Sequence, residues 1–198
     1  MKNAPFIAVT SQPVPYHADT TAIFNTLCQQ NSNSLLLDSA EIGSKNSLQS
    51  LILINAAVKI ICLGNQVTFK ALNANGKQVL KEIHPVLSQL GTSNTAKVEE
   101  EFSVQFAPLD NQLDEDSKLQ AATIFDGLRV ISNHYQHSST PIFLGGLFAY
   151  DLVANFIPMQ GIALQDDGIS CPDYSFYLAE NLITIDHQSQ QATLKSFC

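Results

Sequence analysis

Basic side chains are scarce in this sequence of 198 residues, and tryptophan is missing from it. Arg129 is the sole Arg, and ten Lys and Arg residues stand against eighteen Asp and Glu, which gives a formal charge of −8. Nucleic-acid binding requires a clustered basic surface that neutralises phosphates, and anionic membranes attract the same kind of surface. These few basic residues cannot form one. We therefore exclude nucleic-acid binding and disfavour docking on anionic membranes.

Long hydrophobic runs are also missing. No run approaches the ~18 apolar residues of a membrane span, and the first residues are too often interrupted by polar residues and prolines for a secretory signal. The cysteines are scattered, three of them in apolar surroundings, which is typical of buried thiols and not of a disulfide framework. These observations predict a cytoplasmic protein. The four cysteines are Cys28, Cys62, Cys171 and Cys198.

The apolar content is nevertheless high enough for a packed core. Hydrophobic residues make up 45% of the chain and charged residues 14%, a balance that argues against intrinsic disorder. At roughly 150 residues per domain, the length predicts one domain, covering residues 1–198. The last residues still have the pattern of a strand, with no polar tail after them. We therefore expect a fragment of a longer protein.

Alternating apolar residues predict several strands. Two β-rich runs, residues 58–63 and 66–72, flank Gly64-Asn65, a pair suited to the positive φ of a hairpin turn. The other strands are expected at residues 34–37, which have the pattern of a buried strand, at 101–107 and 143–150, and within 174–197 around a turn at 186–191.

Helical spacing and capping residues predict three helices between these strands. Hairpins and helices alternate without a regular βαβ rhythm, so the expected fold class is α+β, with largely antiparallel sheets and flanking helices. Residues 44–50 are expected to form a short helix or a turn. The three helices are expected at 22–28, with an N-cap within residues 19–21; at 77–90, after a turn at 73–76 and kinked or broken by Pro85; and at 117–135, capped by Asp114 or Asp116.

Known catalytic signatures are not found. The sequence has no G-x-S-x-G elbow, and Gly145-Gly146 belongs to no dinucleotide or phosphate loop, so these glycines indicate close packing of a strand. His134 and His137 would share one helix face, as metal ligands require, but no nearby Cys, Asp or Glu completes a site. We expect a solvated helix end there. Residues 99–101, three consecutive Glu, are expected to form a solvated edge.

Two other groups of residues leave alternatives open. Asp38 and Ser39 follow an apolar strand, where such a pair can bind the ammonium group of a small ligand beside apolar neighbours. Either residue could instead simply cap the next turn. Arg129 could clamp a carboxylate or form an ion pair with Asp126, and we favour the ion pair.

Several segments resemble the N-terminal region of anthranilate synthase component I, most closely its proteobacterial branch. The resemblance covers nearly the whole chain in the family's order and implies the fold of the chorismate-utilising enzymes. A weaker alternative is component I of aminodeoxychorismate synthase, which shares a GLFGYDL-like element. The segments are LLLDSAEIGSK (35–45), LDEDSKL (113–119), FDGLR (125–129), FLGGLFAYDLVANF (143–156) and CPDYSFYLAENLITIDHQ (171–188).

The resemblance also implies a function. Full-length members convert chorismate and ammonia to anthranilate and pyruvate in tryptophan biosynthesis, with a magnesium ion and a glutamine amidotransferase, component II, in an assembly of two plus two chains. L-Tryptophan inhibits them. The chorismate and magnesium residues lie in a C-terminal domain beyond residue 198, so we expect no catalytic residue here and no activity from this chain alone. Two further alternatives are a non-catalytic amino-acid-binding module and a domain that only holds the amidotransferase.

What the resemblance places in this region is part of the tryptophan site. Ser39 matches the tryptophan-binding serine of the family, and Asp38 stands where the family usually has Glu, which keeps the charge on a shorter side chain. Gln49 stands where close relatives often carry Lys. The remaining expected site residues are Leu37 and Ala40, which would frame the indole, and Arg129 and Cys171, which would support regulation indirectly.

Overall fold

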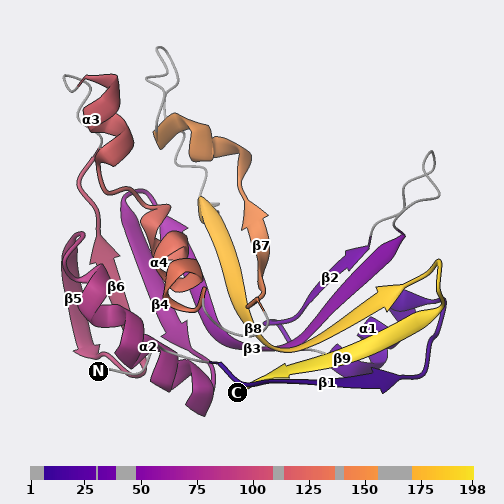
Figure 1. The fold of residues 1–198 in the computed structure, drawn as a ribbon. Coiled ribbons are helices and arrows are strands. Elements are labelled where there is room, and N and C mark those ends of the chain that lie inside the picture. The colour runs from indigo at the N-terminus through magenta and orange to yellow at the C-terminus, as the bar shows by residue number, and fades with distance from the viewer. Residues whose placement is uncertain (1–6, 30, 39–47, 109–113, 137–140, 156–170) are drawn as a thin grey trace. The chain divides into compact units, whose positions relative to one another are not determined.

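The structure is a computed structural model that describes residues 7–29, 31–38, 48–108, 114–136, 141–155 and 171–198. The chain divides into two compact units. Unit 1 consists of Met1–Val58, Tyr135–Gly145 and Tyr177–Cys198, and unit 2 of Lys59–His134 and Gly146–Phe176. The hydrogen-bonded strand order is β1-β9-β8-β3-β4-β6-β5, with β2 also paired to β3 and β7 to β8 (Figure 1).

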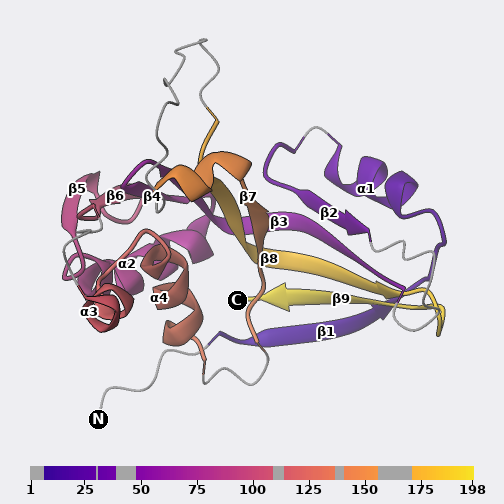
Figure 2. The same ribbon diagram turned by 90° about the horizontal axis from the view of Figure 1, so that it is seen from above.

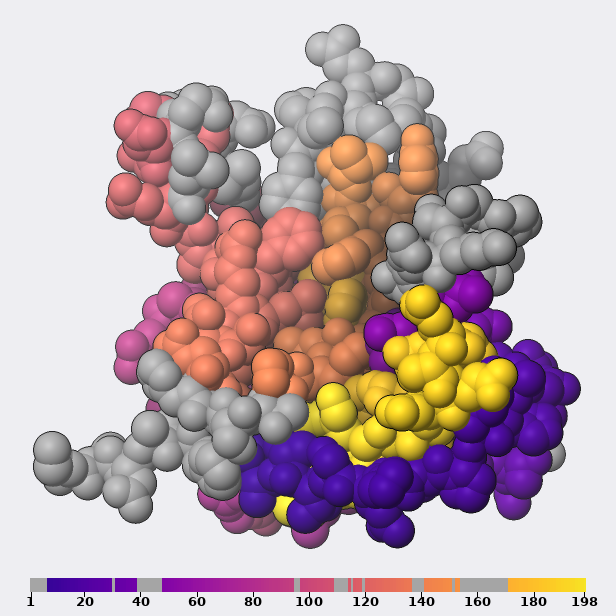
Figure 3. All heavy atoms as spheres, turned by 45° about the vertical axis from the view of Figure 1, so that its right-hand side comes forward, coloured from indigo at the N-terminus to yellow at the C-terminus, as the bar shows by residue number. Residues whose placement is uncertain are grey.

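Unit 1 is built on long antiparallel strands. The first strand, β1, pairs with the last, β9, from Val9 opposite Phe197 to Val14 opposite Ala192. Figure 3 shows the spheres of β1 (indigo) beside those of β9 (yellow). The elements are β1 (Val9–Val14), α1 (Thr20–Cys28), β2 (Leu35–Asp38), the beginning of β3 (Gln49–Leu63), the end of β8 (Tyr174–Asp186) and β9 (Gln191–Phe197).

The core of unit 1 brings together one helix and its strands. Apolar side chains from α1 and from strands β3, β8 and β9 are buried against one another, and Phe24 and Leu36 pack around them. Burying such side chains is the main favourable contribution to folding. The buried residues of this cluster are Cys28, Ile52, Ile183, Ile185 and Ala192.

Unit 2 combines a β-meander with helices. Strand β6 lies between β4 and β5, antiparallel to both, and α2 and α4 lie side by side (Figure 2). The elements are the end of β3, β4 (Gln66–Ala71), α2 (Ala74–Leu87), β5 (Thr92–Lys97), β6 (Glu101–Gln105), α3 (Glu115–Gln120), α4 (Asp126–His134), most of β7 (Leu144–Phe148), the 3-10 helix η1 (Tyr150–Asn155) and the beginning of β8.

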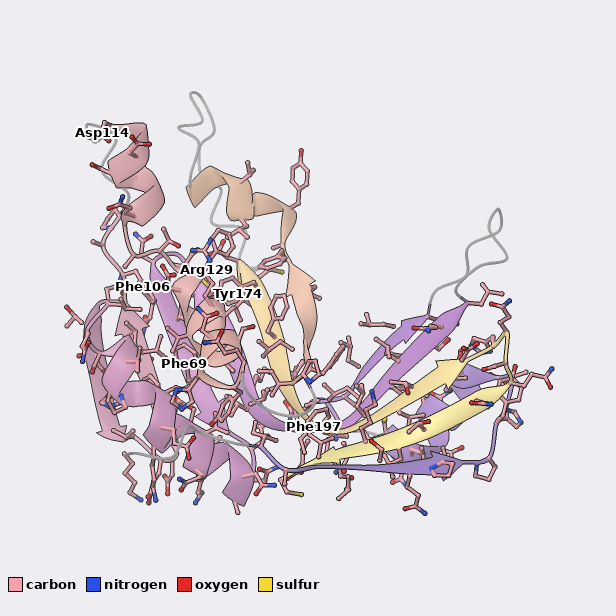
Figure 4. All side chains as sticks on the ribbon, viewed as in Figure 1. Phe69, Phe106, Asp114, Arg129, Tyr174 and Phe197 are labelled. Atoms are coloured by element: carbon pink, nitrogen blue, oxygen red, sulfur yellow. The ribbon has the colours of Figure 1, made fainter. Side chains whose placement is uncertain are left out.

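Aromatic rings fill the core of unit 2. Phe69 stacks on Phe102 with ring centroids 4.9 Å apart, and the Tyr174 hydroxyl donates a hydrogen bond of 2.7 Å to the carbonyl of Ile124. Helix α4 approaches these rings at Gly127, where an added Cβ would lie 3.2 Å from Phe69 and 3.3 Å from the Tyr174 oxygen. Figure 4 labels Phe69 and Tyr174 in this region.

The expected fold class and the hairpin are confirmed. The model mixes helices with antiparallel strands, and Gly64 turns between β3 and β4 with a φ of 58°. Strand β3 begins at Gln49, however, so the helix or turn expected at 44–50 is wrong for residues 49 and 50, which pair as strand. Residues 44–47 lie outside the described residues. Strand β2 is less buried than expected: among the described residues it pairs with β3 alone, and Leu37 is 40% exposed.

The single helix expected at 117–135 is wrong. Helix α3 ends at Gln120, and the backbone of Ala121 is extended. The Asp126 carboxylate accepts the amide hydrogen of Thr123 at 2.6 Å, while the Thr123 carbonyl accepts the amide of Asp126 at 2.9 Å. The first bond is the half of a capping box in which the side chain accepts the amide three residues earlier, and the second is a backbone turn; together they start a new helix. Asp114 caps α3, as expected, by accepting from the amide of Ser117.

Helix α2 begins earlier than expected. Asn73 accepts from the amide of Gly76, which makes residues 74–76 the first turn of the helix. Pro85 lies in the last turn, and the helix ends two residues later at Leu87, not at residue 90. Proline cannot donate to the carbonyl four residues earlier, yet α2 continues through Pro85, so Pro85 does not break the helix at its own position.

The other expectations concern thiols and membranes. Cys28 and Cys62 are buried and Cys171 and Cys198 exposed, and all four are free thiols. The sequence predicts three buried cysteines, and the structure buries two of them. Among the helices of the described ranges, none is both long and apolar enough to cross a membrane.

Candidate ligand site around Asp38

Asp38 lies at the end of a chain of hydrogen bonds in unit 1. Its Oδ1 accepts a 2.5 Å hydrogen bond from the Ser50 hydroxyl, and its Oδ2 accepts from the Thr20 hydroxyl at 3.2 Å. Ser50 Oγ lies 2.8 Å from Nε2 of His187. Nδ1 of the same imidazole lies 3.2 Å from the hydroxyl of Tyr16. Four side chains thus connect to one carboxylate, Thr20 and Ser50 directly and His187 and Tyr16 through Ser50.

Strand register and helix geometry bring these residues together. Asp38 and Ser50 are partners in the β2–β3 ladder, and directly opposite residues have side chains on the same face. Thr20 is the first residue of α1, so the carboxylate lies at the helix end that favours negative charge. His187 follows β8, and its amide donates to the carbonyl of Leu48 at 2.9 Å.

Burial divides the site into a closed base and an open top. Ser50 is completely buried and Thr20 is 4% exposed, whereas Asp38 is exposed. A buried hydroxyl needs a hydrogen-bond partner, and both hydroxyls find theirs on the carboxylate. Each carboxylate oxygen has about two acceptor positions, so the exposed carboxylate can accept further donors.

The charge of unit 1 favours a cationic partner. Within its described residues, Lys195 is the sole Lys or Arg. The acidic residues of the same ranges are Asp19, Asp38, Glu180 and Asp186. A positively charged group that approaches Asp38 therefore meets a net negative surrounding, and opposite charges attract.

Metal binding finds no support in the described residues. No group of three or more His, Cys, Asp or Glu side chains there could hold a metal ion. Nε2 of His134 lies 3.5 Å from the Glu82 carboxylate, at the end of α4. His137 lies outside the described residues. The glutamates of 99–101 form exposed ion pairs, such as Lys81 with Glu99 at 2.8 Å, in agreement with the solvated edge expected there.

Comparison with curated proteins shows what the chain is similar to. Anthranilate synthase component 1 of Haemophilus influenzae is 83% identical over 193 residues, which is 98% of this chain and 37% of that protein. Its counterpart in Vibrio cholerae is 47% identical over 98% of this chain, and that of Escherichia coli is 37% identical over 91%. The chain is homologous to the N-terminal region of anthranilate synthase component 1. It spans little more than a third of the length of these relatives, and no family model matches it.

The positions assigned by the resemblance to anthranilate synthase component 1 fall in both units. In unit 1, Ser39 and Ala40 lie outside the described residues. Leu37 precedes Asp38 in β2, and because neighbouring side chains in a strand point to opposite faces, the two do not share a face. Gln49 is exposed at the first position of β3.

Arg129 and Cys171 belong to unit 2. The Arg129 guanidinium lies 3.3 Å from the Asp126 carboxylate and 6.0 Å from the centre of the Phe125 ring. The ion pair favoured from the sequence is therefore confirmed. Figure 4 labels Arg129 on α4. Cys171 is exposed, shortly before β8 begins at Tyr174.

Four residues of the Asp38 site were missed by sequence analysis. Tyr16, Thr20, Ser50 and His187 lie between 12 and 171 residues from the residues they contact. His187 is an isolated histidine beside a turn, so no spacing rule connects it to Asp38. Only Ser50 has a local signal. If the strand that ends at Asp38 pairs with the next strand in the sequence, a residue of that next strand must lie beside Asp38.

Proposed function

We propose that this chain is the tryptophan-regulatory part of an anthranilate synthase component 1. The observation that carries the proposal is the Asp38 carboxylate, which is exposed and held by two buried hydroxyls at the position where the family resemblance expects the ligand's ammonium group. In the proposed site, Asp38 binds the ammonium of L-tryptophan, Ser39 adds a hydrogen bond, and Leu37 and Ala40 border the indole. Because the side chains of Leu37 and Asp38 point to opposite faces of β2, Leu37 would contact the indole at the edge of the strand.

Inhibition is proposed to work through two conformations. A ligand shifts an equilibrium only by its difference in affinity for the two states. Tryptophan bound at Asp38 would favour a conformation of the whole enzyme in which the chorismate site is poorly formed. Its effect on catalysis is then a coupling free energy between two sites. Arg129, through its ion pair with Asp126, and Cys171 are proposed to support this coupling indirectly.

The catalytic part of the proposal concerns the whole protein. The complete enzyme is proposed to be a cytoplasmic lyase that converts chorismate and ammonia to anthranilate and pyruvate. Component II would supply ammonia from glutamine within an assembly of two plus two chains. A magnesium ion would serve the chorismate site in the C-terminal domain. The described residues of this chain offer no cluster of three or more His, Cys, Asp or Glu side chains for that ion.

The first test is to sequence the coding frame past Cys198. Continuation into a chorismate-binding domain supports the proposal, whereas a stop codon excludes catalysis by the natural protein and favours a small-ligand sensor. Isothermal titration with L-tryptophan follows, using the protein from the complete frame. Asp38→Asn should abolish detectable binding. Glu100→Gln is the matched control, because it removes the same charge from an exposed ion pair with Lys97 in unit 2. Equal tryptophan affinity in Asp38→Asn contradicts the proposal.

A second substitution tests inhibition itself. Ser39→Phe should abolish inhibition by L-tryptophan while leaving anthranilate formation intact, because the phenyl ring would fill the proposed pocket. The measurement is anthranilate fluorescence at increasing tryptophan concentration. If Ser39→Phe is still inhibited and its affinity for tryptophan is unchanged, Ser39 does not bind tryptophan as proposed.

The alternatives predict different results. The relatives named above are all components of anthranilate synthase, which favours that enzyme over aminodeoxychorismate synthase. A complete protein that forms aminodeoxychorismate would reverse this preference. Binding of component II without any tryptophan affinity would indicate a domain that only holds the amidotransferase.

A further inference from the structure

The hydrogen bonds that end at Asp38 have a single possible direction if the imidazole is neutral. The Ser50 hydroxyl has one hydrogen, which it donates to the carboxylate. Its oxygen must therefore accept from Nε2 of His187, 2.8 Å away, so Nε2 carries the imidazole proton. Nδ1 is then an acceptor, and the Tyr16 hydroxyl donates to it at 3.2 Å. The chain runs from Tyr16 through His187 and Ser50 to Asp38, with each donor matched to an acceptor.

This direction of hydrogen-bond donation fixes the orientation of the Asp38 carboxylate. Without a donor on its oxygen, Ser50 could rotate its hydroxyl away from Asp38, because a hydroxyl hydrogen turns freely about its C–O bond. With Nε2–H donating to that oxygen, the hydroxyl hydrogen is directed to Oδ1, while Thr20 holds Oδ2. A carboxylate held at both oxygens does not lose orientational freedom again when a ligand arrives, and such preorganisation raises affinity.

We propose that His187 is a positioning residue that makes the Asp38 site selective for ligands with a primary ammonium group. The inference rests on the proposed function, since it takes L-tryptophan as the ligand. His187 does not touch the ligand: it acts through Ser50. If this role is right, substituting His187 lowers the affinity of a ligand most when that ligand binds the Asp38 carboxylate strongly.

Two ligands separate this role from a merely structural one. Indole-3-propionate has the ring and the carboxylate of L-tryptophan but lacks its ammonium. Disturbing the position of Asp38 should therefore weaken L-tryptophan selectively. General damage to the fold of unit 1 should weaken both ligands alike.

The variants are chosen to remove or keep one donor. His187→Leu removes the donor, and Ser50→Ala removes the link, at a buried position where a smaller side chain introduces no clash. His187→Gln places an amide donor near the position of Nε2 and should rescue the site. His84→Leu is the matched control, because His84 forms a similar part-buried pair with Ser93, 3.1 Å apart, in unit 2.

The experiment is isothermal titration of the protein from the complete coding frame. We expect His187→Leu and Ser50→Ala to weaken L-tryptophan about tenfold, the effect of losing a hydrogen bond to a charged group, with indole-3-propionate unchanged. His187→Gln should lie within about threefold of the unsubstituted protein, and His84→Leu should match it. Unchanged tryptophan affinity in His187→Leu, or an equal loss for both ligands, would overturn the proposal.

A second measurement does not need the ligand. Nitrogen-15 NMR of the imidazole should show the proton on Nε2 of His187 in the unsubstituted protein and a mixture of tautomers after Ser50→Ala. A proton on Nδ1 overturns the direction of the chain, and with it the proposal, whatever binds. Failure of the unsubstituted protein to bind L-tryptophan, with the proton on Nε2, instead contradicts the proposed function.

Discussion

At the scale of single residues, the thiols of this chain differ in their chemistry although none is in a disulfide. Cys62 is fully buried in β3. Burial raises the pKa of its thiol to about 12, and the nearby negative charge of Asp173 acts in the same direction. Burial also raises the pKa of Cys28. Because the thiolate is the reactive form, both should be inert in the folded protein.

Alkylation should therefore distinguish the cysteines. With iodoacetamide at pH 8, we expect Cys171 and Cys198 to be modified first, and Cys28 and Cys62 at least about a hundredfold more slowly. Peptide mass spectrometry over time gives the four rates, and a sample in denaturant, where all four should react alike, is the control. Fast modification of Cys62 in the native protein would contradict its burial.

Asp186 provides a prediction on pH. Its carboxylate accepts the amide hydrogens of Ser189 at 3.0 Å and Gln188 at 2.9 Å. The hydrogen bond from the Ser189 amide, followed by further hydrogen bonds from Ser189 and Gln188, lowers the pKa of Asp186. Since the folded-state pKa lies below the unfolded value, the carboxylate stabilises the fold above the ordinary Asp pKa of about 3.9. That stabilisation is lost as the pH falls through the folded-state pKa.

The substitution Asp186→Asn should flatten the acid limb of the stability curve. Denaturant unfolding at several values between pH 2 and pH 7 measures this, and carboxyl NMR of Asp186 gives its pKa directly. An Asp186 that titrates at or above the usual Asp value would contradict the structure of the β8–β9 turn.

Sequence analysis could identify Asp38 but not its surroundings. The carboxylate was found because it follows an apolar strand within a recognisable family segment. Thr20 and Ser50 contact it, and His187 contacts Ser50, only after α1, β2, β3 and the end of β8 have come together. A contact between residues 137 positions apart, such as that of Ser50 with His187, has no local pattern that could reveal it.

At the scale of elements, local signals succeeded where one residue decides the conformation. Gly64 predicted the turn of the β3–β4 hairpin because few other residues adopt its φ of 58°. The prediction of one helix at 117–135 was wrong because the apolar residues keep their helical spacing across the break between α3 and α4. Ile124, Ile131 and Tyr135 are all buried, but Thr123 and Asp126 start a new helix between the two halves.

The N-cap of α1 is a testable local signal. Asp19 accepts the amide hydrogen of Ala22 at 2.9 Å, so Asp19→Ala should lower the free energy of unfolding by about 0.5–2 kcal/mol. Urea denaturation measures the change. Asp19→Asn is the control and should be nearly neutral, since Asn caps helices equally well. A loss as large in Asp19→Asn would show that charge, not capping, is responsible.

Substitution by alanine should lower stability by different amounts at Gly146 in β7 and at Gly64 in the β3–β4 hairpin. A Cβ at Gly146 would collide with the backbone carbonyl of Ser175 in β8, so Gly146→Ala should cost at least about 2 kcal/mol of stability. At Gly64 nothing lies within 4 Å, and Gly64→Ala should cost about 1 kcal/mol, from its positive φ alone. Thermal or urea unfolding compares the two. A smaller loss at Gly146 than at Gly64 would contradict the close approach of β7 to β8.

At the scale of the whole molecule, the chain spans about a third of the length of its relatives. We expect the purified 198-residue chain to form no anthranilate from chorismate, magnesium and ammonia, because the proposed catalytic residues lie elsewhere. Anthranilate fluorescence is the measurement, with a complete component 1 enzyme as the positive control. Any sustained product formation would contradict this placement of the active site.

The pairing of β1 with β9 has a consequence for how the protein is made. On the ribosome, residues 9–14 leave the exit tunnel long before residues 191–197 have been synthesised, yet the two strands are partners along their whole length. Contacts between distant positions form slowly, and unpaired strand edges invite aggregation. The nascent strand β1 therefore has no β9 to pair with until residues 191–197 have been added. Pro13, which lacks an amide donor, lies in that strand, and proline on a strand edge is one of the features that discourage pairing with the wrong chain.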